Sequence, residues 1–367
     1  MTRLRIGFDA KRLFLNREGL GSYARTLVYN LQKAFPNHEY HLFTPKTGEN
    51  YAEELLDLDK FNVHLPGRKQ NKTLWRAKTM VQDLLDNRID LFIGLSNELP
   101  YGLKASGIKS IVCIHDMIYK YFPHQFNLVD RFIIDLKYRY AINSADLILA
   151  MSRYTKDGLI QTFGIRDEEK LSVLYQSVHP VFEQYNIEST PKRSHFLFVG
   201  TINERKNLDY IVSAYEHLDE QYRVPVVVVG NGKTYKKKII KKIEKAGLEA
   251  LFIFKSNVST EQLAGLYEGA YGLIFPSLCE GFGIPLLEAL MLSVNVIHSQ
   301  NTSITEVVGE HGIIIDLSDI SSLNQAVKDI LEGRIKRDKI KLQKHCERFN
   351  PQLLSEQLMS QIMMIVK

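Results

Sequence analysis

Short apolar runs alternate with longer amphipathic stretches along the chain. The amphipathic stretches of the first half, such as Gly21–Ala34, Lys72–Asn87 and Arg131–Asn143, repeat their apolar residues with a helical period. The apolar runs between them predict strands at Leu4–Phe8, Tyr40–Thr44, Val63–Leu65, Asp90–Leu95, Ser110–His115, Asp146–Met151 and Leu171–Leu174. Strands that alternate with helices indicate a parallel sheet with helices on both faces.

The alternation starts again in the second half. Strands are expected at His195–Val199, Val224–Val229, Leu251–Phe254, Gly272–Phe275, Val294–His298 and Ile313–Ile315, with helices at 207–218, 233–246, 260–269, 284–291 and 318–331. Between the two series, residues 179–194 are polar and contain two prolines. We therefore expect an α/β protein of two doubly wound, Rossmann-like domains, 1–180 and 190–350. The amphipathic helix 351–367 would pack back toward the first domain.

Composition narrows the class of protein. The 367 residues are 45% hydrophobic and 24% charged, as in ordinary globular proteins. The three cysteines, Cys113, Cys279 and Cys346, are too few and too widely spaced for a disulfide scaffold or a zinc site. Neither a membrane-spanning run nor a signal peptide is visible, so we expect a cytoplasmic protein.

The net charge of +5 is too weak to predict nucleic acid binding. All of the excess lies in residues 1–180, which carry 25 Lys and Arg against 20 Asp and Glu. Two interpretations are open: ordinary surface scatter, or a basic face for peripheral contact with an anionic membrane or for a phosphorylated substrate.

Residues 276–288, of sequence PSLCEGFGIPLLE, form the most informative segment. They follow a predicted strand and open a predicted helix, with Pro285 suited to its first turn. Free N–H groups at such a helix start face phosphate or sugar oxygens. Glu280 in the loop and Glu288 in the helix are eight residues apart, so both carboxylates can face one cleft and accept hydrogen bonds from sugar hydroxyls.

This segment resembles the E-x7-E signature of the family-4 retaining glycosyltransferases, which have the GT-B fold: two Rossmann-like domains facing a central cleft. The resemblance extends to residues 198–207, 257–270 and 303–309, and so to nearly all of the second half. It implies that Glu288 holds the nucleotide ribose and that Glu280 holds the donor sugar. The main chain that would line the donor beside Glu280 belongs to Gly281, Phe282, Gly283 and Ile284.

The resemblance also assigns roles in two other loops. Arg205 and Lys206 lie between a predicted strand and helix, where two cations suit a diphosphate leaving group. Gly200 precedes them as a donor-binding position; many relatives place an Arg directly after this glycine, where the chain has Thr201. Val258 lies where relatives hold the base through the main chain.

The first half resembles the family more loosely. Gly19 and Gly21 open a predicted helix and imply a loop near the donor phosphates or the acceptor. The same residues fit the G-x-G-x-x-A dinucleotide fingerprint, which would indicate an NAD-dependent oxidoreductase. The fingerprint starts ten residues after the strand that ends at Asp9, and no acid closes the second strand. These departures disfavour the oxidoreductase.

His115 ends a strongly apolar predicted strand, and Asp116 follows it. A His-Asp pair here resembles a subset of bacterial members, many of them mannosyltransferases. It implies that His115 hydrogen-bonds the donor sugar or accepts a developing proton, with Asp116 orienting the ring.

The resemblance therefore implies a retaining hexosyltransferase of surface polysaccharide biosynthesis, such as lipopolysaccharide synthesis. GDP-mannose is the first expectation for the donor and a UDP-hexose the second; the acceptor is a saccharide or lipid-linked oligosaccharide. No metal ion or cofactor is expected, and the D-x-D of Asp57 and Asp59 is ascribed to a solvated surface. The alternative on the same fold is a catalytically silent nucleotide-sugar-binding subunit.

Overall fold

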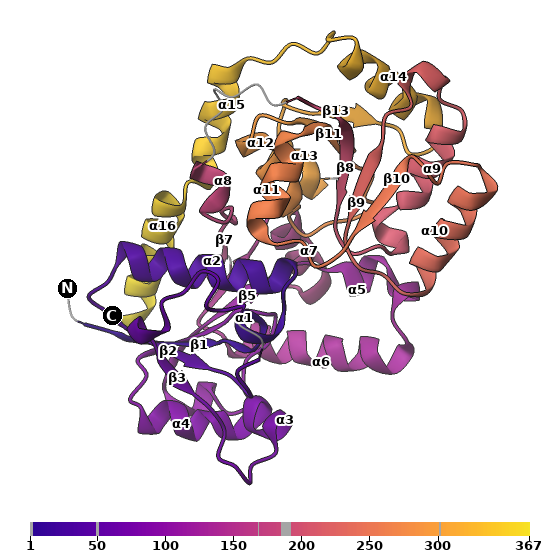
Figure 1. Ribbon diagram of the computed structural model, residues 1–367. Coiled ribbons are helices and arrows are strands. Elements are labelled where there is room, and N and C mark those ends of the chain that lie inside the picture. Colours follow the sequence, from indigo (N-terminus) through magenta and orange to yellow (C-terminus); the bar gives the residue numbers. More distant parts are fainter. Residues whose placement is uncertain (1–2, 49–50, 168, 185–191, 301) are drawn as a thin grey trace. The chain divides into compact units, whose positions relative to one another are not determined.

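A computed structural model of the protein describes residues 3–48, 51–167, 169–184, 192–300 and 302–367. The chain forms two compact units, one of residues 1–177 with 349–367 and one of residues 178–348. Each unit is a parallel sheet with helices around it, which confirms the α/β fold class (Figure 1). The polar segment 179–194 includes residues 185–191, which lie outside the described residues.

The sheet of the first unit has seven parallel strands in the order β3-β2-β1-β4-β5-β6-β7. The interior strands are buried runs, such as β4 and β6, because helices cover both faces. The strands are β1 (Arg5–Asp9), β2 (Glu39–Phe43), β3 (Asn62–His64), β4 (Leu91–Gly94), β5 (Lys109–Ile114), β6 (Leu147–Ala150) and β7 (Leu171–Val173).

The helices of the first unit include one interrupted stretch and the last helix of the chain. The stretch Lys72–Asn87 is not one regular helix as expected, because a π-helical turn, Trp75–Thr79, separates α3 from α4; Trp75 is fully buried there. The last helix of the chain, α16, packs on α2 within this unit. The helices are α1 (Lys11–Leu15), α2 (Gly19–Ala34), α3 (Lys72–Leu74), α4 (Met80–Asp86), α5 (Ile118–Tyr121), α6 (Leu128–Ser144), α7 (Arg153–Phe163) and α16 (Pro351–Val366).

The sheet of the second unit has six parallel strands in the order β10-β9-β8-β11-β12-β13. β8 and β11 are therefore neighbours although they are far apart in sequence. The strands are β8 (His195–Val199), β9 (Val226–Val229), β10 (Phe252–Lys255), β11 (Ala270–Phe275), β12 (Asn295–Ser299) and β13 (Ile313–Ile315). The helices are α8 (Val181–Gln184), α9 (Leu208–Glu216), α10 (Thr234–Lys245), α11 (Thr260–Glu268), α12 (Ile284–Met291), α13 (Thr302–Val308), α14 (Ile320–Leu331) and α15 (Lys339–Cys346).

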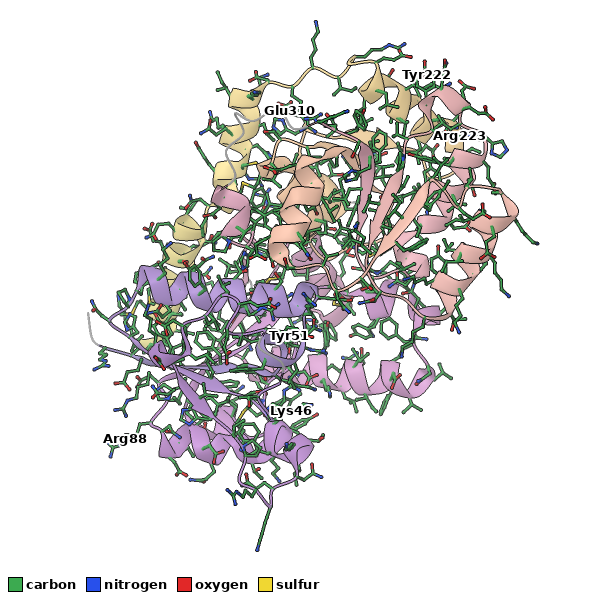
Figure 2. All side chains as sticks on the ribbon, viewed as in Figure 1. Lys46, Tyr51, Arg88, Tyr222, Arg223 and Glu310 are labelled. Atoms are coloured by element: carbon green, nitrogen blue, oxygen red, sulfur yellow. The ribbon has the colours of Figure 1, made fainter. Side chains whose placement is uncertain are left out.

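Side chains fill the space between sheet and helices in each unit, while labelled polar residues such as Arg88 and Glu310 extend into solvent (Figure 2). A buried cluster of the second unit runs from β8 and β9 to α9 and α14. Among the helices that the structure describes, none combines the length and the apolar character needed to span a bilayer.

Candidate active site

The second unit brings two cations and a carboxylate together at the carboxyl ends of β8 and β11. Arg205 and Lys206 lie in a single 3-10 turn, Glu204–Lys206, which follows β8. Glu280 lies in the loop between β11 and α12. Because β8 and β11 pair in the sheet, residues 74 or more positions apart become neighbours.

Glu280 accepts from both cations through one oxygen. Its Oε1 lies 2.6 Å from Nη1 of Arg205 and 2.8 Å from Nζ of Lys206, and the hydroxyl of Ser277 donates to the same oxygen. Arg205 also donates to the carbonyl of Cys279 at 2.5 Å, which ties its turn to the Glu280 loop. The three charged side chains are only 9–13% exposed, so water screens these ion pairs weakly.

The positive charges of Lys206 and Arg205 keep the Glu280 carboxyl ionised. Burial by itself would raise the pKa of its carboxyl, but the positive charges of Lys206 and Arg205 bring that pKa below its ordinary value. Glu280 is therefore a carboxylate at neutral pH, and the site holds two positive charges against one negative charge. This surplus positive charge suits a dianionic group such as a diphosphate.

Gly200 makes room for Lys206. Its φ is +141°, and a Cβ at this position would lie 3.1 Å from Cε of Lys206. The lysine stem passes over this glycine, and its Nζ lies 4.3 Å from the centroid of the Phe275 ring. The absence of a side chain at Gly200 thus lets the ammonium group reach Glu280.

Glu288 lies in the second turn of α12, is 7% exposed, and has a partner that sequence reasoning missed. The hydroxyl of Tyr267, from the last turn of α11, lies 2.8 Å from its Oε2 and 3.1 Å from the carbonyl oxygen of Pro285. The ring of Phe182 packs edge-on against Tyr267 with centroids 5.9 Å apart. Tyr267 is therefore held in place and in turn holds one carboxyl oxygen of Glu288.

Burial raises the pKa of Glu288 to about 7, and the Tyr267 hydrogen bond offsets only part of this effect. Glu288 thus titrates near neutral pH, unlike Glu280. The two acids of the E-x7-E pattern differ because cations face Glu280, whereas a neutral hydroxyl faces Glu288.

The main chain of residues 281–284 leads from Glu280 into α12. Gly283 is the N-cap of that helix, and Phe282 is 3% exposed. The hydroxyl of Ser303 donates to the carbonyl of Glu280 at 2.6 Å, so α13 braces the loop. Val258 lies at the same edge of the sheet, in the loop between β10 and α11.

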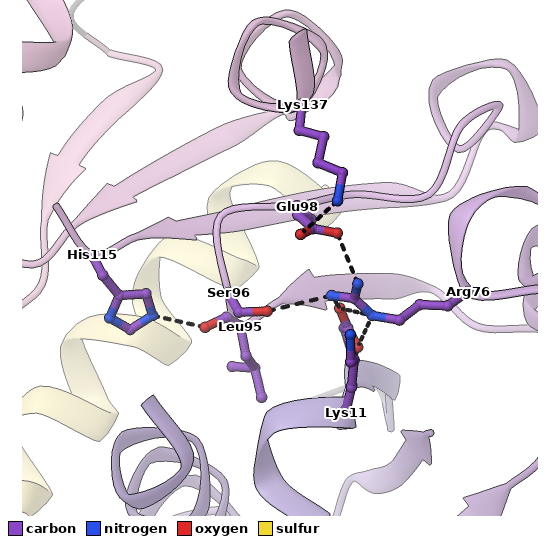
Figure 3. A network of polar contacts seen from close by, with 8 residues as sticks. Lys11, Arg76, Leu95, Ser96, Glu98, His115 and Lys137 are labelled. Carbon is purple, nitrogen blue, oxygen red and sulfur yellow. Dashed lines mark hydrogen bonds and ion pairs between the residues drawn. The ribbon is translucent and has the colours of Figure 1, made fainter. Parts of the chain in front are cut away.

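His115 lies in the first unit, directly after β5, and is 5% exposed. Its Nε2 lies 2.8 Å from the carbonyl oxygen of Leu95, so Nε2 carries the proton and Nδ1 is an acceptor in the neutral ring (Figure 3). The ring of Tyr23 packs edge-on against it. Burial lowers the pKa of His115 to about 4. His115 is thus too weak a base to take a proton at neutral pH, but it remains a hydrogen-bond acceptor.

The glycines of the first unit differ from each other. Gly21 lies in the first turn of α2, where a Cβ would be 1.6 Å from the carbonyl oxygen of Asn16. This contact by itself requires glycine, so the packing of α2 explains the glycine at position 21 without any ligand. A Cβ at Gly19 would meet no atom within 4 Å.

A second charged network, which sequence reasoning missed, lies at the carboxyl ends of β1 and β4 (Figure 3). Arg76, from the π-helical turn, donates through Nε to both carboxylate oxygens of Asp9 at 3.0 and 3.1 Å and through Nη1 to Glu98 at 2.8 Å. Lys137 donates to the other oxygen of Glu98 at 3.2 Å. Arg76 lies in the π-helical turn Trp75–Thr79, and no spacing pattern in the sequence indicates that it contacts Asp9.

The structure thus divides the site residues expected from the sequence between the units. Arg205, Lys206 and Glu280 are in direct contact in the second unit, where Gly200, Val258, Glu288 and residues 281–284 also lie. Gly19, Gly21 and His115 belong to the first unit.

Comparisons with known proteins find glycosyltransferases. A family model described as Glycosyltransferase Family 4 matches residues 17–181, and one described as Glycosyl transferases group 1 matches residues 182–345. O-antigen chain mannosyltransferase B of Escherichia coli is 26% identical over 342 residues, which is 86% of this chain and 87% of that protein. O-antigen chain mannosyltransferase RfbU of Salmonella typhimurium is 28% identical over 60% of each chain.

Solved structures match the whole fold. HepE from Anabaena, crystallised with UDP and glucose, superimposes with a TM-score of 0.75 at 16% identity, over 98% of this chain and 99% of that one. WaaG, a glycosyltransferase involved in lipopolysaccharide biosynthesis, gives a TM-score of 0.68 at 15% identity over 97% and 98%. At these identities the likeness concerns the fold.

Proposed function

The chain belongs to the glycosyltransferases of the GT-B fold, and we propose that it transfers mannose from a nucleotide-diphosphate sugar, GDP-mannose first of all, to a saccharide or lipid-linked acceptor. The observation that carries the proposal is the contact of Arg205 and Lys206 with Glu280 at the start of α12. The mannosyltransferase names of the relatives support mannose, and their O-antigen role supports an acceptor of surface polysaccharide synthesis.

The donor diphosphate would bind Arg205 and Lys206. Both cations now share one oxygen of Glu280, and a diphosphate offers them more negative charge than this single carboxylate. When the cations turn to the diphosphate, Glu280 becomes free to accept hydrogen bonds from the sugar hydroxyls. Without a donor, the Glu280 carboxylate thus pairs with the two cations, and with a donor bound it binds the sugar.

Glu288 would hold the nucleotide ribose. Tyr267 takes Oε2, which leaves Oε1 for a ribose hydroxyl. A carboxylate accepts from both ribose hydroxyls better than a carboxylic acid does, so donor binding draws Glu288 toward its ionised form. Main-chain N–H groups of Gly283 and Ile284 and of the Val258 loop complete the nucleotide-sugar contacts.

His115 would accept a hydrogen bond from the donor sugar at Nδ1. Its pKa of about 4 keeps the ring neutral, and the Leu95 carbonyl keeps the proton on Nε2. The leaving phosphate, rather than His115, would take the acceptor proton. The two cations would stabilise the charge that grows on the diphosphate as the sugar–phosphate bond breaks, without a metal ion and with retention of anomeric configuration.

A thermal-shift screen with GDP, UDP, ADP and NAD tests the proposal. A nucleotide at 100 times its Kd stabilises a protein by about 2.7 kcal/mol, so a ligand of the site raises the melting temperature visibly. We expect the largest shift with GDP, and no shift with GDP in Glu288→Ala. The exposed Glu310→Ala in the same unit is the matched control. A shift with NAD and none with any diphosphate, or an unchanged GDP shift in Glu288→Ala, would overturn the assignment.

A lipid-linked acceptor would also determine where in the cell the enzyme works. A lipid-linked acceptor lies at the inner face of the membrane, and the positive excess of residues 1–180 supports peripheral contact with anionic lipid.

A further inference from the structure

Tyr23, in the second turn of α2, packs against His115, the candidate sugar ligand of the first unit. The two rings stand edge to face, with centroids 4.6 Å apart and an angle of 88° between their planes. Both side chains are buried in the first unit. Aromatic rings at this distance and angle attract each other beyond the burial of their surfaces, so the contact fixes the plane of the imidazole.

Two hydrogen bonds also hold His115. Its Nε2 donates to the carbonyl oxygen of Leu95 at 2.8 Å, and its backbone N–H donates to the side chain of Asn97 at 2.8 Å (Figure 3 shows the first of these). These bonds fix the residue and the tautomer of its ring, but a ring bonded at Nε2 alone can still tilt about that bond. The edge-on contact with Tyr23 removes this freedom and so decides the direction of the Nδ1 lone pair.

Tyr23 also lies against β5, the strand that His115 follows. Cys113 of this strand is fully buried and comes two residues before His115. Burial raises the pKa of the Cys113 thiol to about 12, and the neighbouring Tyr23 hydroxyl offsets part of the rise. The Tyr23 side chain therefore reaches from Cys113 to His115 and ties α2 to the carboxyl end of β5.

The start of α2, from which Tyr23 projects, is itself held closely in place. A Cβ at Gly21 would lie 1.6 Å from the carbonyl oxygen of Asn16, so α2 lies nearer to the preceding loop than any side chain would allow. Arg25 ties the same loop, because its Nη1 donates to the carbonyl oxygen of Asn16 at 2.9 Å. Gly21 and Arg25 lie two residues before and after Tyr23. Their contacts with the loop therefore set how near the Tyr23 ring comes to β5.

We propose that Tyr23 is a positioning residue of the transfer: it holds the His115 ring so that Nδ1 can accept from a hydroxyl of the donor sugar. Gly21 would then serve the reaction through the packing of α2 rather than by contact with the donor phosphates. The proposal rests on the role of His115 in the proposed function. Hydrogen bonds weaken steeply as their geometry departs from the ideal, so a small tilt of the ring would cost much of this bond.

Nitrogen NMR of the ligand-free protein, with labelled histidine, tests the contact without reference to activity. The test variant is Tyr23→Met, which fills most of the volume without a ring, and Tyr23→Phe keeps the ring. The matched control is Tyr40→Met, the same change at a buried tyrosine of β2. We expect Tyr23→Met to raise the pKa of His115 from about 4 toward its ordinary 6.5, because water reaches the ring. The other two variants should keep the wild-type value.

A double-mutant cycle tests the role of Tyr23 in the reaction. Tyr23→Met should lower kcat/KM for the donor by about tenfold, the effect of losing one hydrogen bond, and Tyr23→Phe should restore it. In a His115→Ala background the change Tyr23→Met should have little further effect, because it acts through the His115 ring.

Three outcomes would overturn the proposal. The first is an unaltered pKa of His115 in Tyr23→Met, and the second is an additive effect of Tyr23→Met and His115→Ala. The third needs no variant: a wild type without a nuclear Overhauser effect between the protons of the two rings. A His115→Ala variant with the kinetics of the wild type would refute the sugar contact in the proposed function, and with it the role of Tyr23 in transfer, even where NMR shows the contact.

Discussion

Glu288→Gln measures how much the free energy of unfolding falls when the buried Glu288 carboxyl, the proposed ribose ligand, ionises. In the ligand-free protein Glu288 is buried, its hydrogen-bond partner Tyr267 is neutral, and its pKa is raised from the ordinary 4.5 to about 7. The folded protein therefore holds the proton more tightly than the unfolded chain does. This contribution to stability is fully present below pH 4.5 and is lost as the pH rises to 7.

The size of the loss follows from the raised pKa. At 1.36 kcal/mol per pKa unit, a rise from 4.5 to about 7 amounts to about 3 kcal/mol once the carboxyl is ionised in both states. Glutamine has the shape of the protonated acid and accepts from the Tyr267 hydroxyl through its amide oxygen. Glu288→Gln should therefore match the wild type at pH 4.5 and be about 3 kcal/mol more stable at pH 8, or roughly 6–12 °C in Tm for a unit of this size.

Calorimetric unfolding of both proteins at the two pH values, without nucleotide, measures this difference. The exposed Glu249→Gln in the same unit is the matched control, because it makes the same chemical change in water. GDP should protect the wild type and fail to protect Glu288→Gln, since the ribose loses its carboxylate. An equal difference in Tm at pH 4.5 and 8, or a variant less stable than the wild type at pH 8, would refute the assigned charge state.

Three other predictions concern the same site. Tyr267→Phe removes a hydrogen bond to a charged group and should weaken GDP binding by about tenfold or more, and the loss should grow below pH 7 because the pKa of Glu288 rises further; calorimetric titration across pH measures it. Arg205→Ala and Lys206→Ala should each lower kcat by about 100-fold or more with KM for the donor changed much less, whereas the exposed Lys241→Ala should not; near-normal kcat in both variants would place the leaving-group site elsewhere. Chelation of divalent metals should leave turnover intact, and activity lost in chelator and restored by manganese would contradict the metal-free transfer.

Much of the fold followed from local periodicity. Strands β8 and β13 have the expected bounds, and the bounds of the other strands differ from the expected ones by one or two residues. The agreement arises because a strand buried between two helical layers is a short apolar run, which can be seen in the sequence alone. The helix α12 also begins where Gly283 and Pro285 indicated. The segment around Trp75 departs from the pattern, since a π-helical turn forms there; Trp75 is buried in it, and Arg76 of the same turn contacts Asp9.

The sequence by itself determined which chemical groups the site contains: the E-x7-E pair, the two cations and the glycines around them. Tertiary structure decided what these groups do to each other. The pairing of β8 with β11 joins Arg205 to Glu280, and α11 brings Tyr267 to Glu288, so two acids of one motif acquire pKa values shifted in opposite directions. Packing also decided that Ala141 and Ile142 of α6 are buried while Leu128 and Phe132 of the same helix are exposed. Hydrophobic periodicity reports the residues on each face of a helix, whereas only contacts between distant segments report which face water still touches.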